Sequence, residues 1–193
     1  GKFVNFLRIF KYVAIFFVCI TLISIVSLRF LNPPFTSFII SESKFFKKTY
    51  SYEWTPIEKA GKNILLAMVS TEDSRFCSHM GFDLTELYKV YAKNEKRGAS
   101  TISQQVAKNL FLWSGRSYVR KGFEAYLAFL LEIFLPKKRI LEIYINIVET
   151  APFSFGVNSL SVAIFDKTVD KLNADQALKI ALVLPNPKNR SPL

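Results

Sequence analysis

Histidine and cysteine are scarce in this chain of 193 residues, which holds one histidine and two cysteines. With His79 alone, a histidine-rich metal site is excluded. Cys19 lies in an apolar run and Cys77 in a polar segment, so we expect no pairing between them, no disulfide framework and no cysteine zinc site. No alternating strand pattern, internal repeat or low-complexity tract is visible either. The length allows one well-formed domain and an appendage.

Charge is absent from residues 12–28, which lie between Lys11 and Arg29. Phe30 and Leu31 lengthen this run, so it reaches the range that spans a bilayer. We prefer an uncleaved anchor to a signal peptide, because no small-x-small cleavage site follows, and to a buried core helix, because the run lacks a polar face. No second run of spanning length follows, so a single pass is expected.

Acidic residues are absent from the first 30 positions, where Lys2, Arg8 and Lys11 precede the run and Arg29 follows it. This distribution predicts a cytoplasmic N-terminus and an outer domain beyond the membrane. The net charge is +11, and the part after the anchor keeps 22 basic against 15 acidic residues. Nucleic acid is an unlikely partner outside the cytoplasm, so the basic surplus favours lipid phosphates and the bilayer surface.

Helical periods dominate after the prolines at 33–34. We expect helices at 60–70, at 101–112 after a capping box, at 123–134 before Pro136, at 140–147 and at 177–184. The predicted fold class is therefore mostly α. We divide the chain into a tail and anchor (1–31), a linker and membrane-proximal segment (32–54) and a catalytic domain (55–193). The aromatics and lysines of the second part suit either a membrane interface or the domain core.

Three carboxylates and the histidine gather in residues 72–83, directly after the first of these helices. Glu72 and Asp73 are expected where a core helix surfaces, and a half-buried carboxylate beside a like charge suits a general base. A plain polar loop is the alternative.

Cations dominate two later clusters. Residues 96–105 place Lys96, Arg97 and Gly98 before a capped helix, which suits either an anion site or an ordinary capped helix. Arg116, Arg120, Lys121 and Glu124 form either a surface ion-pair helix or a site in which Glu124 is turned toward the core. In the last cluster, residues 137–146, Glu142 and Asn146 share a helix face and are interpreted as structural, with Lys137 as an exception.

In order and spacing these clusters resemble the peptidoglycan glycosyltransferases of glycosyltransferase family 51. The resemblance covers residues 54–192 and rests on five segments: E-D-x-x-F-x-x-H-x-G from Glu72, G-x-S-T-x-x-Q-Q from Gly98, R-K-x-x-E from Arg120, K-x-x-I-L-E-x-Y-x-N from Lys137, and a closing segment from Phe155 to Pro187. The single anchor and the lack of a long C-terminal extension resemble the monofunctional members. Departures from the pattern occur at Cys77, at residues 149–152 and at residues 165–167.

The resemblance implies a lysozyme-like helical fold with a small membrane-associated jaw subdomain, in a bacterial cytoplasmic membrane with the catalytic domain outside. It also implies polymerisation of lipid II onto a growing glycan chain by inverting transfer, with release of undecaprenyl pyrophosphate. Cell-wall synthesis or division proteins are the implied protein partners.

The resemblance further implies residue roles. Glu72 is the expected catalytic base, and Glu124 the second essential glutamate, which orients a cation or a divalent metal, Mg²⁺ or Mn²⁺. The substrate-binding residues would be Lys108, Arg116, Lys121 and Arg120 at the pyrophosphate, Ser100, Thr101, Gln104 and Gln105 along the cleft, and Lys89 at the acceptor's phosphates. Asp73 and His79 are expected to shape the loop. A lytic muramidase and a non-catalytic lipid II-binding protein are the rival functions.

Overall fold

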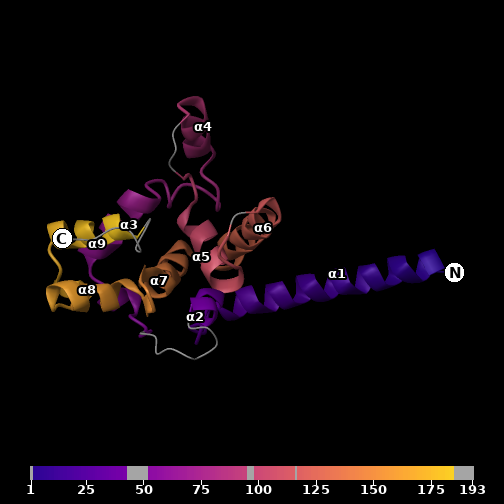
Figure 1. The fold of residues 1–193 in the computed structure, drawn as a ribbon, viewed down its shortest axis with the longest axis horizontal. Helices are drawn as coiled ribbons and strands as arrows, with labels where there is room; N and C mark the ends of the chain where they lie inside the picture. The colour runs from indigo at the N-terminus through magenta and orange to yellow at the C-terminus, as the bar shows by residue number, and fades with distance from the viewer. Residues whose placement is uncertain (1, 43–51, 95–97, 116, 185–193) are drawn as a thin grey trace.

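The computed structural model describes residues 2–42, 52–94, 98–115 and 117–184. Over these residues the chain is mostly helical, which confirms the predicted fold class. The first helix, α1 (Lys2–Ser27), extends away from the body of the molecule (Figure 1). Within the described residues it is the one helix long and apolar enough to cross a membrane, over Asn5–Ser27.

The C-terminal half of α1 is held against the body by specific contacts. Thr21 shares a hydrogen bond of 2.9 Å with Tyr126, and the Phe17 ring lies 5.8 Å from the ring of Phe123. Beyond the helix, Arg139 donates to the carbonyls of Leu28 at 2.8 Å and Leu31 at 2.9 Å. The end of α1 is thus bonded to the domain that follows it.

The body is built around helix α5 (Ile102–Phe111), which packs against α6 (Tyr118–Phe134) and α7 (Lys137–Ile147). A short helix, α2 (Ser37–Glu42), lies beside α5. On the other side of the body α3 (Lys62–Glu72) packs against α9 (Ala174–Val183), with α8 (Val157–Phe165) next to α9. Short 3₁₀ turns occur at Ile57–Lys59 and Val169–Lys171. The hydrophobic core runs through these helices, so the ends of α3 and α5 are fixed relative to each other.

Local sequence explains where the helices begin. Thr101 and Gln104 form the predicted capping box at the start of α5, and Asn173 and Gln176 form another before α9. Helix α6 begins earlier than expected, because the Ser117 hydroxyl accepts the Arg120 N–H and starts the helix one turn ahead of the apolar stripe.

The expectation of no strand is wrong for one short hairpin. Strand β1 (Glu149–Ala151) pairs antiparallel with β2 (Ser154–Phe155). At the turn Phe153 adopts a φ of 63°, a left-handed conformation in a segment without glycine. Gly156 follows with a φ of 87°, and a Cβ there would come within 3.0 Å of the Asn146 carbonyl. Five residues are too few to show alternation in the sequence.

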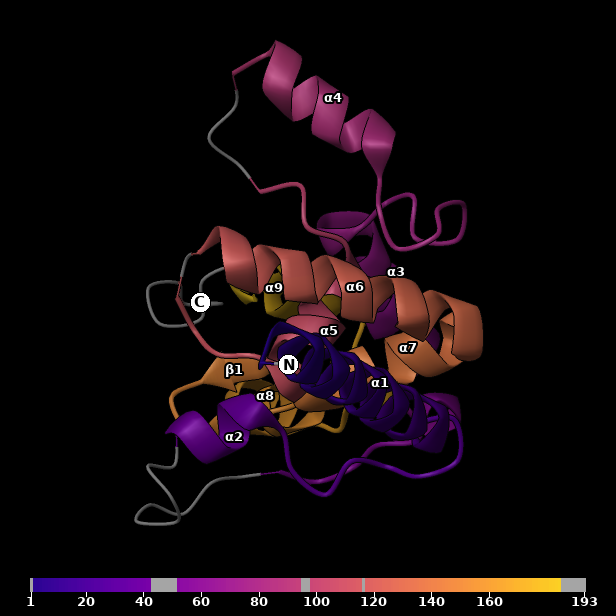
Figure 2. The same ribbon diagram turned by 90° about the vertical axis from the view of Figure 1, so that its right-hand side faces the viewer.

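Helix α4 (Leu84–Ala92) stands apart from the other helices (Figure 2) and contains no buried residue. The membrane-associated jaw stays a prediction, and residues 43–51 of the proposed segment at 32–54 lie outside the described residues. Of its aromatics, Tyr52 and Trp54 pack against the core, whereas Phe35 is exposed. The core alternative therefore holds for Tyr52 and Trp54, and the membrane interface stays a prediction for the exposed Phe35.

Candidate active site

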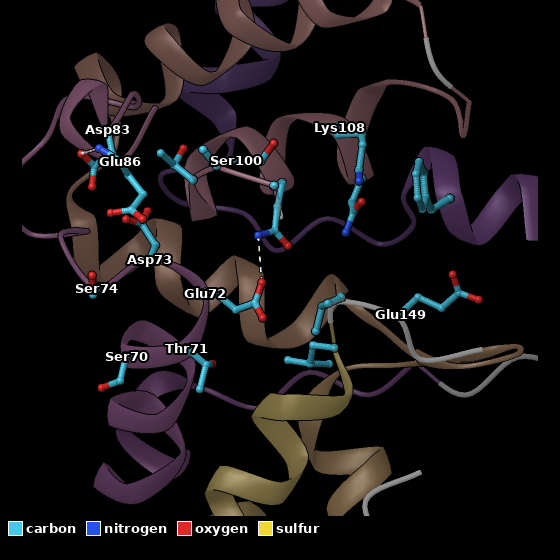
Figure 3. Close-up of a pocket in the computed structure, with 18 residues that line it drawn as sticks. Ser70, Thr71, Glu72, Asp73, Ser74, Asp83, Glu86, Ser100, Lys108 and Glu149 are labelled. Carbon is cyan, nitrogen blue, oxygen red and sulfur yellow. Dashed lines mark hydrogen bonds between the residues drawn. The ribbon is translucent and has the colours of Figure 1, made fainter. Parts of the chain in front are cut away.

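A cleft of about 620 Å³ opens where the C-terminal end of α3 meets α5 (Figure 3). Its walls come from segments far apart in the chain, including the loop before α5, the start of α4 and the hairpin. One end carries the carboxylates of Asp73, Asp83 and Glu86, whereas Lys108 and Glu149 lie toward the other, with Glu72 between them. The lining residues are Phe38, Ser70, Thr71, Glu72, Asp73, Ser74, Asp83, Glu86, Gly98, Ala99, Ser100, Thr101, Gln105, Lys108, Asn109, Val148, Glu149 and Leu184.

Glu72 is the last residue of α3, whose buried side chains Ile64 and Met68 hold the helix in the core. The helix surfaces here as predicted, and the Glu72 side chain is half-buried. Gln105 of α5 donates from Nε2 to Glu72 Oε2 at 3.2 Å, the bond marked by the dashed line in Figure 3. A carboxylate held at the end of a rigid helix and facing a cleft can take a proton from a bound hydroxyl group.

The Asp73 carboxylate is occupied by hydrogen bonds within the protein. His79 Nε2 lies 2.8 Å from both oxygens of the Asp73 carboxylate, and His79 Nδ1 accepts the Gly81 N–H at 3.1 Å. Since Nδ1 is an acceptor, this network assigns the proton to Nε2 and a neutral ring to His79. Asp73 Oδ2 also accepts the Ile102 N–H at 3.0 Å. Asp73 and His79 therefore join the loop to the start of α5.

The N-terminus of α5 is a capped helix start, as predicted, and the anion site at residues 96–105 stays a prediction. Asp73 takes the Ile102 N–H, and the Thr101 hydroxyl accepts the Gln104 N–H at 3.2 Å. These backbone donors are used within the protein, so an anion in the cleft would depend on side-chain cations instead. Lys96 and Arg97 lie outside the described residues.

Lys108 supplies such a cation from the wall of the cleft. Its Nζ lies 5.7 Å from the centre of the Phe38 ring of α2. Burial lowers the pKa of Lys108 below its ordinary value, Glu124 raises it, and the charges of Arg120 and Lys121 lower it. An ammonium group that has lost part of its water shell gains from binding an anion.

Glu124 lies in the core rather than at the surface, with only 2% of its side chain exposed. Arg120 donates to its Oε2 at 2.8 Å and Lys121 to its Oε1 at 2.5 Å. Lys121 also donates to Ser100 of the cleft wall at 3.1 Å. The surface ion-pair alternative is therefore wrong for this cluster, and the alternative in which Glu124 is turned toward the core holds.

As held here, Glu124 does not fit a metal ligand, because each carboxylate oxygen already accepts from a cationic side chain. Among the described residues, no group of three His, Cys, Asp or Glu side chains converges in a way that could hold an ion. The divalent cation stays a prediction.

Glu142 and Asn146 of the last motif support the site from behind, as expected, and Lys137, the expected exception, makes structural bonds as well. Asn146 bonds to both backbone groups of Thr55, and Glu142 accepts the Ile57 N–H at 2.8 Å. Lys137 donates to the His79 carbonyl at 2.6 Å and to Glu132 at 2.7 Å, so it ties α6 and α7 to the loop after Glu72.

Comparison with known proteins decides the family. The family model described as "Transglycosylase" matches residues 40–193. A biosynthetic peptidoglycan transglycosylase of Shewanella oneidensis is 41% identical over 174 residues, covering 86% of this chain and 75% of that protein. Proteins of the same name from Bacteroides thetaiotaomicron and Marinomonas sp. are 39% and 43% identical, each over 94% of this chain and over 77% and 80% of their own lengths.

The chain belongs to the transglycosylase family. The resemblance drawn from the motifs is thereby confirmed.

In this family member, five of the predicted site residues line the cleft: Glu72, Ser100, Thr101, Gln105 and Lys108. Lys121 is next to it through Ser100, and Glu124 and Arg120 lie behind Lys121. Arg116 lies outside the described residues.

Two further predicted positions, Gln104 and Lys89, also lie outside the cleft wall. Gln104 turns its side chain back to cap α5, where Oε1 accepts the Thr101 N–H at 2.9 Å. Lys89 is half-exposed on α4, and its Nζ lies 3.7 Å from Glu86. The expectation that Gln104 lines the cleft is therefore corrected, and the capping box was itself the signal that could have excluded it.

Four residues of interest were given no role in the site by the sequence argument. Asp83 caps α4 and Glu86 follows it, and both contribute to the acidic end of the cleft. Glu149 reaches the cleft from the hairpin, which had no strand signal. Tyr144 is buried behind the cleft and donates to Gln105 at 3.1 Å, a contact across 39 positions that no local pattern shows.

Proposed function

We propose that this transglycosylase polymerises lipid II into the glycan strands of peptidoglycan, with inversion at the donor's anomeric carbon and release of undecaprenyl pyrophosphate. The observation that carries the proposal is the separation of charge along one cleft. The Glu72 carboxylate faces it from the end of α3, and the Lys108 ammonium faces it from α5. The names of the relatives support the substrate class.

Glu72 would act as the general base. The acceptor's 4-hydroxyl gives its proton to Glu72 as its oxygen forms the new bond to the anomeric carbon. The bond from that carbon to the pyrophosphate oxygen breaks at the same time, and its electron pair leaves with the pyrophosphate. One base is enough, because this leaving group needs no acid to protonate it.

The pyrophosphate instead needs positive charge. Lys108 would contact it directly, since its ammonium group is half-buried in the cleft wall. Lys121 bonds to Ser100 of the cleft wall and would contact the pyrophosphate from there. Glu124 would hold Lys121 and Arg120 in place as a positioning residue. Arg116 is expected to join this group. Thr101 and Gln105 would line the sugar path, and Lys89 would meet the acceptor's phosphates.

Polymerisation of labelled lipid II by the full chain in detergent, with a divalent cation, tests this proposal. The expected product is a glycan ladder that disappears with Glu72→Gln, which keeps the shape of the side chain and removes the base. Glu58→Gln is the matched control, because Glu58 pairs with Lys138 on the exposed surface and is not part of the cleft wall.

Two results would contradict the proposal. Polymer from Glu72→Gln at the wild-type rate would remove Glu72 from the role of base. Release of fragments from pre-formed glycan, with no polymer from lipid II, would instead favour the lytic reaction.

Anchoring by α1 with the N-terminus in the cytoplasm completes the proposal. Lys2, Arg8 and Lys11 stand before the apolar run, and one arginine follows it closely. The exposed thiol of Cys77 makes the orientation measurable. A membrane-impermeant maleimide added to intact spheroplasts should modify the wild-type chain and leave Cys77→Ser unmodified. Labelling that occurs only after lysis would show the opposite orientation, with the domain in the cytoplasm.

A further inference from the structure

Tyr144 is a fully buried tyrosine on α7, a helix that contributes no residue to the cleft wall. Its hydroxyl lies 3.1 Å from Gln105 Oε1 on α5. Burial raises the pKa of Tyr144 well above its ordinary value, and the charges of Glu72 and Asp73 raise it further. The phenol therefore keeps its proton throughout the physiological range and acts as a donor to Gln105.

A donor at this position decides which way the Gln105 amide faces. A glutamine side chain carries an acceptor and a donor group at nearly the same place, and it can exchange them by rotating. With Tyr144 donating to Oε1, the amide nitrogen is turned toward Glu72, where Nε2 lies 3.2 Å from Oε2. The opposite rotation would point a carbonyl oxygen at the carboxylate and leave the phenol without its acceptor.

We propose that Tyr144 is a positioning residue that acts through Gln105 to hold the Glu72 carboxylate in the orientation for proton abstraction. The relay runs from α7 through α5 to the last residue of α3. It rests on the proposed role of Glu72 as the base. Tyr144 itself does not touch substrate in this arrangement.

Tyr144→Phe tests the relay, because it removes the hydroxyl and keeps the ring in the core. We expect kcat for lipid II polymerisation to fall about 3- to 10-fold, the range that corresponds to one lost hydrogen bond. KM should stay unchanged, since the bond acts on the base and not on binding of lipid II. Tyr126→Phe is the matched control: its hydroxyl bonds to Thr21 at 2.9 Å, outside the cleft, and kcat should keep its wild-type value.

A double-mutant cycle separates the relay from a purely structural role. Gln105→Met breaks both bonds and should lower kcat at least as much as Tyr144→Phe does. If Tyr144 acts through Gln105, adding Tyr144→Phe to Gln105→Met should lower kcat by less than about twofold more. Effects that multiply would show that Tyr144 works by another route and would overturn the proposal. Circular dichroism melts of all the variants report whether each is folded.

The failure of the relay and the failure of the proposed function give different results. If Glu72→Gln is inactive while Tyr144→Phe keeps the wild-type kcat, the relay alone is wrong. If Glu72→Gln polymerises normally, the base assignment is wrong, and the relay falls with it.

Discussion

The buried pair between Lys137 and Glu132 makes a strong prediction about stability. Only 2% of the Glu132 side chain is exposed, and its Oε1 accepts from Lys137 at 2.7 Å and from Ser103 at 2.5 Å. Lys137 also bonds to the His79 carbonyl and lies 4.5 Å from the centre of the Phe76 ring. Lys137→Met keeps most of the side-chain volume but leaves Glu132 in the core without its cation.

The expected loss follows from these contacts. Removing one partner of a buried ion pair costs about 3–5 kcal/mol in free energy of unfolding. The Ser103 bond remains, and 26% of the Lys137 side chain is already exposed, so we expect a loss of about 3 kcal/mol. For a chain of this size the melting temperature would fall by about 6–12 °C.

Thermal unfolding of the full chain in detergent, followed by circular dichroism, measures this loss. Lys138→Met is the matched control on the same helix, since Lys138 pairs with Glu58 at the surface, and its melting temperature should be that of the wild type. A wild-type melt for Lys137→Met, or an equal loss for Lys138→Met, would refute the reasoning.

Three further predictions concern the cations and the glycines. Burial lowers the pKa of Lys108, so its charge is lost at a lower pH than that of an ordinary lysine. Lys108→Arg, which stays charged, should move the alkaline fall of kcat/KM to higher pH, and an unchanged alkaline limb would contradict the role of Lys108. Glu124 raises the pKa of Lys108, so Glu124→Gln should move the same limb to lower pH in a pH–rate profile, besides lowering kcat. Gly61 has a φ of 83°, and a Cβ there would lie 2.7 Å from Asp170 Cα, so Gly61→Ala should cost about 2 kcal/mol or more in free energy of unfolding. Gly122 faces open space within α6, and Gly122→Ala should gain about 0.5–1 kcal/mol; denaturant titration checks both, and equal effects would be inconsistent with this backbone argument.

Most of the helices could be predicted because their signals are local. The capping box of Thr101 and Gln104 predicts the start of α5, and the apolar stripe from Ile64 to Met68 predicts α3. Such signals need only neighbours along the chain, so tertiary structure is not required to recognise them. The hairpin lacked such a local signal, because Phe153 takes its left-handed conformation without a glycine.

The sequence predicted which residues belong to the site better than it predicted how their side chains are arranged. Glu72 follows from its place at the end of a core helix, but the choice between Gln104 and Gln105 depends on how α5 is rotated. Packing of α5 against α6 and α7 sets that rotation, and the residues that make this packing lie far along the chain from α5. The burial of Glu124 and the contact of Tyr144 with Gln105 likewise need the assembled core.

Arg139 joins the segment that follows α1 to the body of the protein through several contacts at once. It donates to Leu28, Leu31 and Asn32, pairs with Glu142 and lies over the Trp54 ring. These contacts fix the end of α1 to α7, the helix that carries Tyr144, so the anchor and the helix behind the cleft are joined through one side chain.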